Sequence, residues 1–187
     1  MADTGFRSFS ATSGDWYISG ANAIDDNDST QSQIFNFSGG IETAYVSELE
    51  GDDIPTGATI NGVEIQTITK YGTNPSGGIT FTVQVSSNGV SGTYDTSETS
   101  ETLGSGYSTE TFGSSTELWG VNFGTWTDIT NLAVKMIFTP GTTALYVADV
   151  AEVRAKINYT PMEPKPHPRL SVKGGNFKIL SGKLTIK

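Results

Sequence analysis

The chain has 187 residues, no Cys, one His and a formal net charge of −9. Without cysteine, disulfide scaffolds and thiolate zinc sites are excluded, and one histidine leaves a single candidate for His-activated nucleophilic catalysis. The 20 Ser, 26 Thr and 22 Gly favour short strands joined by turns over helices.

The charge is divided unevenly along the chain. Residues 1–161 hold 5 basic against 19 acidic residues, a net charge of −14, whereas residues 162–187 hold six basic residues and one acidic one, a net charge of +5. Because phosphate neutralisation needs clustered Lys and Arg, the acidic body argues against a nucleic-acid partner.

Alternation of apolar and polar residues predicts the first strands at residues 6–10, 33–37 and 43–49. The clearest alternation is in residues 60–68, where Val63, Ile65 and Ile68 are expected to face inward, followed by residues 79–85. We expect these last two segments to form a hairpin across the Gly- and Pro-containing turn at residues 71–78.

Residues 91–115 consist mostly of Ser, Thr, Gly and Glu and predict a long exposed loop. Further strands are predicted at residues 132–138, 144–147 and 150–159, with a bend at Asp149. About eight short strands at this spacing indicate an all-β fold, an antiparallel, jelly-roll-like β-sandwich.

Three regions follow from this pattern: a sandwich body at residues 1–160, a proline-rich spacer at 161–168 and a C-terminal strand-forming arm at 169–187. The arm holds three alternating stretches and cannot bury its apolar face alone, so it must dock on its own body, on another copy or on a different protein. The spacer favours reaching away from the body. The arm residues expected to contact the partner are Leu170, Val172, Lys173, Phe177, Lys178, Ile179, Lys183, Leu184 and Ile186.

The sequence offers little for catalysis. Residues 25–29, which include Asp25, Asp26 and Asp28, place oxygen ligands at alternate positions and so suggest calcium, but the Gly and Glu of an EF-hand are missing, and the alternative is an Asx-rich turn. His167 lies between two prolines of the spacer. We therefore expect no enzyme, no cofactor and no catalytic residue.

Three tryptophans are the candidates for contact with a glycan. Trp16, Trp119 and Trp126 could stack on sugar rings, and packing in the core or at its rim is the alternative.

The run Ile-Pro-Thr-Gly-Ala-Thr-Ile-Asn-Gly-Val-Glu at residues 54–64, with weaker pieces spread over residues 16–160, resembles β-sandwich virion proteins of tailed bacteriophages. The resemblance implies a non-enzymatic structural protein, for which we expect a capsid decoration or cement role. The expected partners are other copies of the chain, as a homo-oligomer, or a major virion protein, with neither nucleic acid nor a membrane involved.

The resemblance does not say where on the particle the protein lies; the low charge density, the many Ser/Thr turns and the absence of Cys lead us to expect the exterior of the virion, after synthesis in the host cytoplasm. The N-terminus lacks the features of a signal peptide, and no stretch is apolar enough to span a membrane. The alternative function is a carbohydrate- or receptor-binding module of a tail or head fibre. A polysaccharide-cleaving enzyme has no supporting arrangement of residues.

Overall fold

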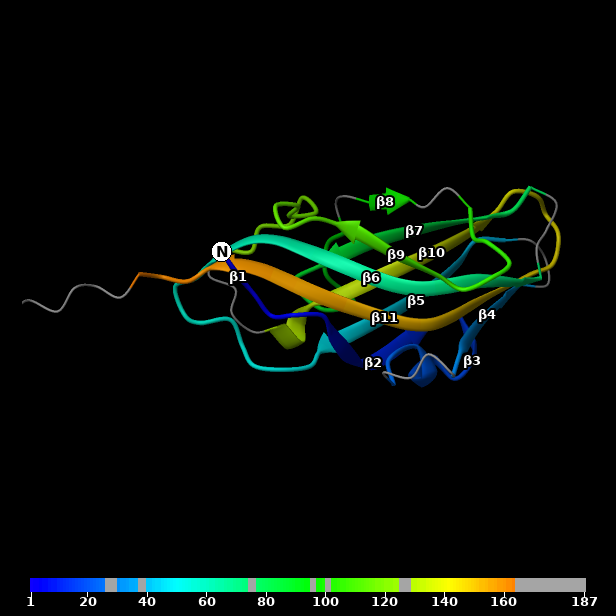
Figure 1. Cartoon of the computed structure of the whole chain (residues 1–187). Coiled ribbons are helices and arrows are strands. Elements are labelled where there is room, and N and C mark those ends of the chain that lie inside the picture. Colours follow the sequence, from blue (N-terminus) through cyan, green and yellow to red (C-terminus); the bar gives the residue numbers. More distant parts are fainter. Residues whose placement is uncertain are drawn as a thin grey trace, which may run out of the picture.

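The computed structural model describes residues 1–25, 30–36, 40–73, 77–94, 97–99, 102–124 and 129–163. Within these ranges the chain forms eleven strands and two short 3-10 helices, and the long strands stack in two layers (Figure 1). The elements are β1 (Ala2–Asp3), β2 (Arg7–Gly14), β3 (Trp16–Ile18), η1 (Gly20–Ala23), β4 (Ser32–Asn36), β5 (Glu42–Leu49), β6 (Thr59–Thr73), β7 (Ile79–Ser86), β8 (Ser97–Thr99), β9 (Ser108–Gly113), η2 (Ile129–Asn131), β10 (Ala133–Pro140) and β11 (Tyr146–Thr160). None of the described helices has the length and apolar character to cross a membrane.

The strand pairings are all antiparallel and form two sheets. Sheet A has the order β3-β4-β11-β6-β9, with β1 also paired to β11. Sheet B has the order β2-β5-β10-β7-β8. Strand β2 belongs to both, because Arg7 and Ser8 pair with β11 whereas residues 9–14 pair with β5. The predicted all-β antiparallel sandwich is confirmed.

The core lies between the two sheets and follows the alternation of the sequence. In β7 the residues Ile79, Phe81 and Val83 have no exposed surface, as predicted. The ring of Phe81 lies 5.0 Å from that of Phe138 in sheet B and 5.7 Å from that of Phe112 in sheet A, measured between centroids. This aromatic cluster joins the layers, and burying each such side chain stabilises the fold by about 1.5–3 kcal/mol.

One residue of β6 that was predicted to face the core, Ile68, faces outward instead. Val63 and Ile65 are buried as expected, but Ile68 is only half-buried and lies opposite Glu152 of β11. Because the side-chain period of a strand is two, Thr67 and Thr69 take the inward positions instead. The prediction for Ile68 was wrong because its apolar character was given more weight than the alternation.

The predicted hairpin is also wrong. Strand β6 pairs with β9 and β11 in sheet A, whereas β7 pairs with β8 and β10 in sheet B. The connection therefore carries the chain from one layer to the other. Alternation shows that a strand has a buried face but not which strand lies beside it.

Two further boundaries differ from the predictions. Residues 146–160 form one continuous strand in which Asp149 pairs with Lys70, and bulges on either side replace the expected bend. The segment 91–115, predicted as a loop, contains β9 and the buried side chains of Leu103 and Phe112. In β9 only one apolar residue faces the core, so the alternation was too weak to detect.

The buried phenols predict how stability depends on pH. The Tyr146 hydroxyl donates to the carbonyl oxygens of Phe138, at 3.1 Å, and Gly40, at 3.3 Å. Burial raises the pKa of Tyr146, and burial together with Tyr45 raises the pKa of Tyr94 to about 12. Above about pH 10 the unfolded chain loses phenol protons that the folded chain keeps, so the free energy of unfolding should fall as pH rises.

Urea unfolding at about pH 8 and about pH 11 measures this dependence. The variant Tyr146→Phe should be less stable at the lower pH, because it loses both hydrogen bonds, and should show a shallower decline toward the higher pH. An unchanged decline in Tyr146→Phe would contradict this role of the phenol.

Candidate ligand-binding hollow

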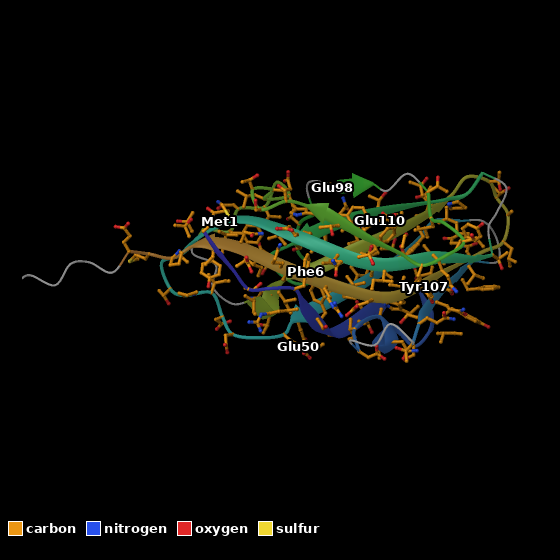
Figure 2. All side chains as sticks on the ribbon, in the orientation of Figure 1. Met1, Phe6, Glu50, Glu98, Tyr107 and Glu110 are labelled. Carbon is orange, nitrogen blue, oxygen red and sulfur yellow. The ribbon has the colours of Figure 1, made fainter. Side chains whose placement is uncertain are left out.

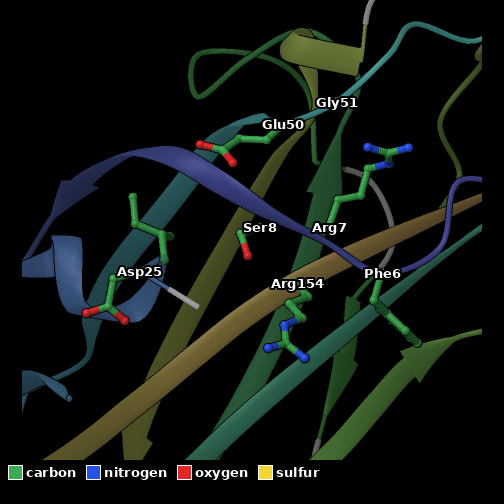
Figure 3. Close-up of a pocket in the computed structure, with 8 residues that line it drawn as sticks. Phe6, Arg7, Ser8, Asp25, Glu50, Gly51 and Arg154 are labelled. Carbon is green, nitrogen blue, oxygen red and sulfur yellow. The ribbon is translucent and has the colours of Figure 1, made fainter. Parts of the chain in front are cut away.

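A hollow of about 770 Å³ lies where β2 passes from sheet A to sheet B (Figure 3). Its volume falls within the range of small-molecule sites. The residues that line it are Phe6, Arg7, Ser8, Ile24, Asp25, Glu50, Gly51 and Arg154.

The backbone brings three separate segments to this hollow. Ser8 pairs with Arg154 of β11, and the backbone N–H of Glu50 donates to the Ser8 carbonyl at 2.9 Å. The following pair, Phe9 and Leu49, has no exposed surface and anchors both strands in the core. The rim is therefore built on the start of β2, the segment after β5 and the interior of β11.

Close packing against a glycine fixes the direction of Arg7. Its Nε donates to the Thr4 carbonyl at 2.9 Å, and its guanidinium passes directly over Gly51. Gly51 has a φ of +122°, and a Cβ at this position would collide with Nη1 of Arg7. The backbone conformation thus favours glycine, and any side chain at this position would displace the guanidinium.

Arg154 is held in place by the buried carboxylate of Glu152. Its Nε forms an ion pair with Oε1 of Glu152, whose side chain is 1% exposed. A guanidinium fixed in this way presents hydrogen-bond donors in a defined plane.

An aromatic ring lies at the edge of the hollow. Phe6 is half-buried, and the Lys156 ammonium lies 4.9 Å from the centroid of its ring. Lys156 is in turn paired with Glu64 at 2.9 Å, and Glu64 accepts from Asn158 Nδ2 at 2.8 Å. The ring is therefore supported by a chain of polar contacts on β6 and β11.

The hollow combines four kinds of groups. Arg7 and Arg154 are donors, Asp25 and Glu50 are acceptors, and the formal charges of these four side chains cancel. The Ser8 hydroxyl can donate or accept, and Phe6 offers an apolar ring. This set suits an uncharged ligand that carries many hydroxyl groups. The only histidine, His167, lies outside the described residues.

The tryptophans predicted to contact a glycan lie elsewhere. Trp119 has no exposed surface and donates its indole N–H to the Val63 carbonyl at 2.8 Å, so for this residue the structure shows the core-packing alternative and not a glycan contact. Trp16 is half-buried against the core. Trp126 falls outside the described residues.

The predicted calcium ligands are only partly described. Asp25 lines the hollow and accepts from the Thr30 hydroxyl at 2.6 Å, whereas Asp26 and Asp28 lie outside the described residues. No cluster of three metal-binding side chains occurs in the part of the chain that the structure describes.

The C-terminal arm lies outside the described residues as well, so its docking stays a prediction. This applies to the arm residues Leu170, Val172, Lys173, Phe177, Lys178, Ile179, Lys183, Leu184 and Ile186.

Sequence reasoning missed most of the residues that line the hollow. One signal could have found them: Arg7 and Arg154 are the only arginines in residues 1–161, a segment with 19 acidic residues, and both line this hollow. Their proximity depends on the pairing of β2 with β11, residues far apart in the sequence.

No protein-family model matches the chain, and no characterised protein sequence matches it either. Several solved structures are similar to it. The CBM32 module of AlyQ in complex with 4,5-unsaturated mannuronic acid is 13% identical, with a TM-score of 0.41, and the match covers 80% of this chain and 96% of that chain. TmCBM61 in complex with β-1,4-galactotriose is 11% identical, with a TM-score of 0.38 and coverages of 81% and 88%.

A chitosan-binding module of a chitosanase/glucanase from Paenibacillus sp. IK-5 is 19% identical, with a TM-score of 0.36 and coverages of 80% and 98%. In truncated AlyQ, which carries CBM32 and alginate lyase domains, the chain covers 35% of the length, with 13% identity and a TM-score of 0.45. The structures covered nearly in full are thus non-catalytic modules, and some matches lie within enzymes. At these identities the likeness concerns the fold alone.

These matches correct the expected resemblance to phage virion proteins. The CBM32, CBM61, CBM4 and chitosan-binding structures among the matches are carbohydrate-binding modules and not virion components. The prediction of a capsid decoration protein is therefore wrong. Its most specific basis was the run at residues 54–64, a Pro- and Gly-containing turn that leads into β6, and a run of this kind does not define a function.

Proposed function

We propose that this chain is a non-catalytic carbohydrate-binding module whose ligand occupies the hollow beside Arg154. The observation that carries the proposal is the lining itself, in which two guanidinium groups and two carboxylates surround a hydroxyl and a half-buried ring. Sugar hydroxyls both donate and accept hydrogen bonds, so they use both kinds of charged group, and the apolar face of a sugar packs on a ring such as Phe6.

Charge favours a neutral sugar over an acidic one. The four charged side chains of the hollow cancel, whereas residues 1–161 carry a net charge of −14. A polyanionic glycan would meet repulsion from the body without a compensating excess of cations in the hollow. Binding of the neutral ligand should depend only weakly on salt concentration.

The lining supports binding rather than catalysis. Ser8 is the one hydroxyl of the hollow, and among the described residues no histidine is present to activate it. The carboxylates lie on exposed segments, with Asp25 following η1 and Glu50 following β5.

The variant Glu50→Ala tests the proposal against a closely matched control. Glu50 is exposed and lines the hollow, whereas Asp52 is exposed and does not line it, and each substitution removes one negative charge. Loss of a charge-assisted hydrogen bond costs about 1.5–3 kcal/mol, so Glu50→Ala should weaken binding by about 10- to 100-fold. Asp52→Ala should bind like the wild type.

The measurement is a screen of the wild type on immobilised neutral, acidic and cationic polysaccharides, followed by calorimetry on the glycan retained. Both variants should keep wild-type stability, since exposed substitutions change it by about 0.5 kcal/mol or less. Retention on no polysaccharide, or equal affinities for the two variants, would show that the hollow does not bind sugar.

A further inference from the structure

A second group of aromatic and polar side chains lies on the outer face of sheet A, the face turned away from the core. We name it the tyrosine strip. Its members are Tyr17, Gln33, Phe35, Lys70, Tyr107 and Asp149.

Two exposed tyrosine rings mark the ends of the strip. Tyr17 of β3 is 60% exposed and Tyr107, next to β9, is 40% exposed. Strands β4, β11 and β6 lie between β3 and β9, so the backbones of these two outer strands are about 19 Å apart at the usual strand spacing, and the Tyr107 side chain reaches back over β6. Figure 2 shows Tyr107 over the front layer, where β6 and β11 lie.

Both rings are held in place by neighbouring side chains. Tyr17 packs on Phe35, with ring centroids 5.0 Å apart. The Lys70 ammonium lies 4.4 Å from the centroid of the Tyr107 ring, and the Tyr107 hydroxyl bonds to the Gln31 side chain. Rings fixed before a ligand arrives lose little entropy on binding.

The centre of the strip is polar and without net charge. Lys70 and Asp149 form an ion pair at 3.5 Å, and Gln33 Nε2 donates to Asp149 Oδ1 at 2.9 Å. The Asp149 side chain is 4% exposed, so the accessible surface here is made of rings, amides and the flank of the lysine. This surface suits an uncharged chain of sugar rings.

The strip and the hollow lie on the same face. Glu64 and Lys70 are both outward residues of β6, because they are six positions apart in a strand of period two. Glu64 pairs with Lys156, whose ammonium contacts Phe6 at the hollow. Six residues of strand measure about 20 Å, a length that several linked sugar rings cover.

We infer that the ligand is an extended, uncharged polysaccharide chain that is bound at the hollow and continues over the outer face of sheet A to the tyrosine strip. The inference rests on the proposed function and adds to it the length and charge of the ligand. If the inference is correct, the affinity for an oligosaccharide must increase with its number of sugar rings.

Calorimetry with disaccharides and hexasaccharides of the neutral β-1,4-linked gluco-, xylo- and galacto- series tests the inference on the full chain. For the series that binds, the hexasaccharide should bind at least about tenfold more tightly than the disaccharide, because each stacked ring adds about 0.5–1.5 kcal/mol. Tyr17→Ala and Tyr107→Ala should each weaken hexasaccharide binding by about 3- to 10-fold. Both should leave disaccharide binding unchanged.

Two controls separate ring stacking from other effects. Tyr107→Phe keeps the ring and should retain most of the affinity, and Leu118→Ala removes an exposed apolar side chain outside the strip and should change nothing. Tyr17 is the more exposed of the two tyrosines, so Tyr17→Ala remains informative if Tyr107→Ala folds poorly.

Three results would overturn the inference. Affinity that is independent of chain length, or insensitive to both tyrosine substitutions while still lost in Glu50→Ala, would confine the ligand to the hollow and leave the proposed function intact. Self-association that disappears in the tyrosine variants would make the strip a subunit interface. Binding of no oligosaccharide of either length would overturn the proposed function together with the inference.

Discussion

Trp119→Ala should lower the free energy of unfolding by about 3–5 kcal/mol, the largest effect that we expect from a single substitution. The indole has no exposed surface, and its N–H bonds to the Val63 carbonyl of β6 at 2.8 Å. The backbone at Trp119 has a φ of +55°, and its N–H donates to Oε1 of Glu117 at 2.6 Å. The side chain thus fixes the segment after β9 against sheet A, and its removal leaves both a cavity and an unpaired carbonyl.

Urea denaturation monitored by circular dichroism measures this loss, with Leu118→Ala as the neighbouring control. Leu118 is 38% exposed, so its truncation should cost less than about 1 kcal/mol. If Trp119→Ala kept the stability of the wild type and lost only sugar binding, Trp119 would contact the ligand and the core assignment would be wrong.

Gly51→Ala should weaken ligand binding by about tenfold or more while the protein still folds. A methyl group at this position displaces the Arg7 guanidinium, and one lost charge-assisted hydrogen bond is worth about 1.5–3 kcal/mol. The positive φ adds a folding cost of about 1–3 kcal/mol. We therefore expect a variant that is less stable than the wild type but still mostly folded. The loss of affinity should be larger than the loss of folded protein explains.

Gly89→Ala is the matched control for backbone strain. Gly89 also has a positive φ, +70°, but no atom lies within 4 Å of the added Cβ. This variant should lose stability and keep its affinity, as measured by calorimetry on the same glycan. Equal loss of affinity in both variants would indicate that strain, and not the position of Arg7, controls binding.

The sequence predicted the positions of the strands better than it predicted which strands pair with each other. Alternation located β5, β7 and β10 to within a residue or two, because each has one face in the core. It failed for the hairpin between β6 and β7 since pairing depends on contacts between distant residues. It also missed β9, where only Phe112 faces the core.

The candidate site was less predictable than the fold. The large apolar rings of the tryptophans made them candidates for contact with a sugar. The same large apolar surface favours burial, and Trp119 packs in the core. The hollow depends on Ser8 meeting Arg154 across two strands, a pairing that local pattern does not encode. Among the residues that the structure describes, the exposed aromatic side chains are those of Tyr17 and Tyr107, and alternation alone does not separate them from the buried Tyr146.

The most direct test of sugar binding is to map the bound glycan by NMR. The neutral oligosaccharide selected in the screen is titrated into the ¹⁵N-labelled full chain, and changes in amide chemical shift are followed for each residue. We predict the largest changes at Arg7, Ser8 and Gly51 around the hollow, with further changes near Tyr107 for a hexasaccharide. Changes confined to the smaller hollow that Asn88 and Asn122 line, or no changes at all, would contradict a sugar site beside Arg154.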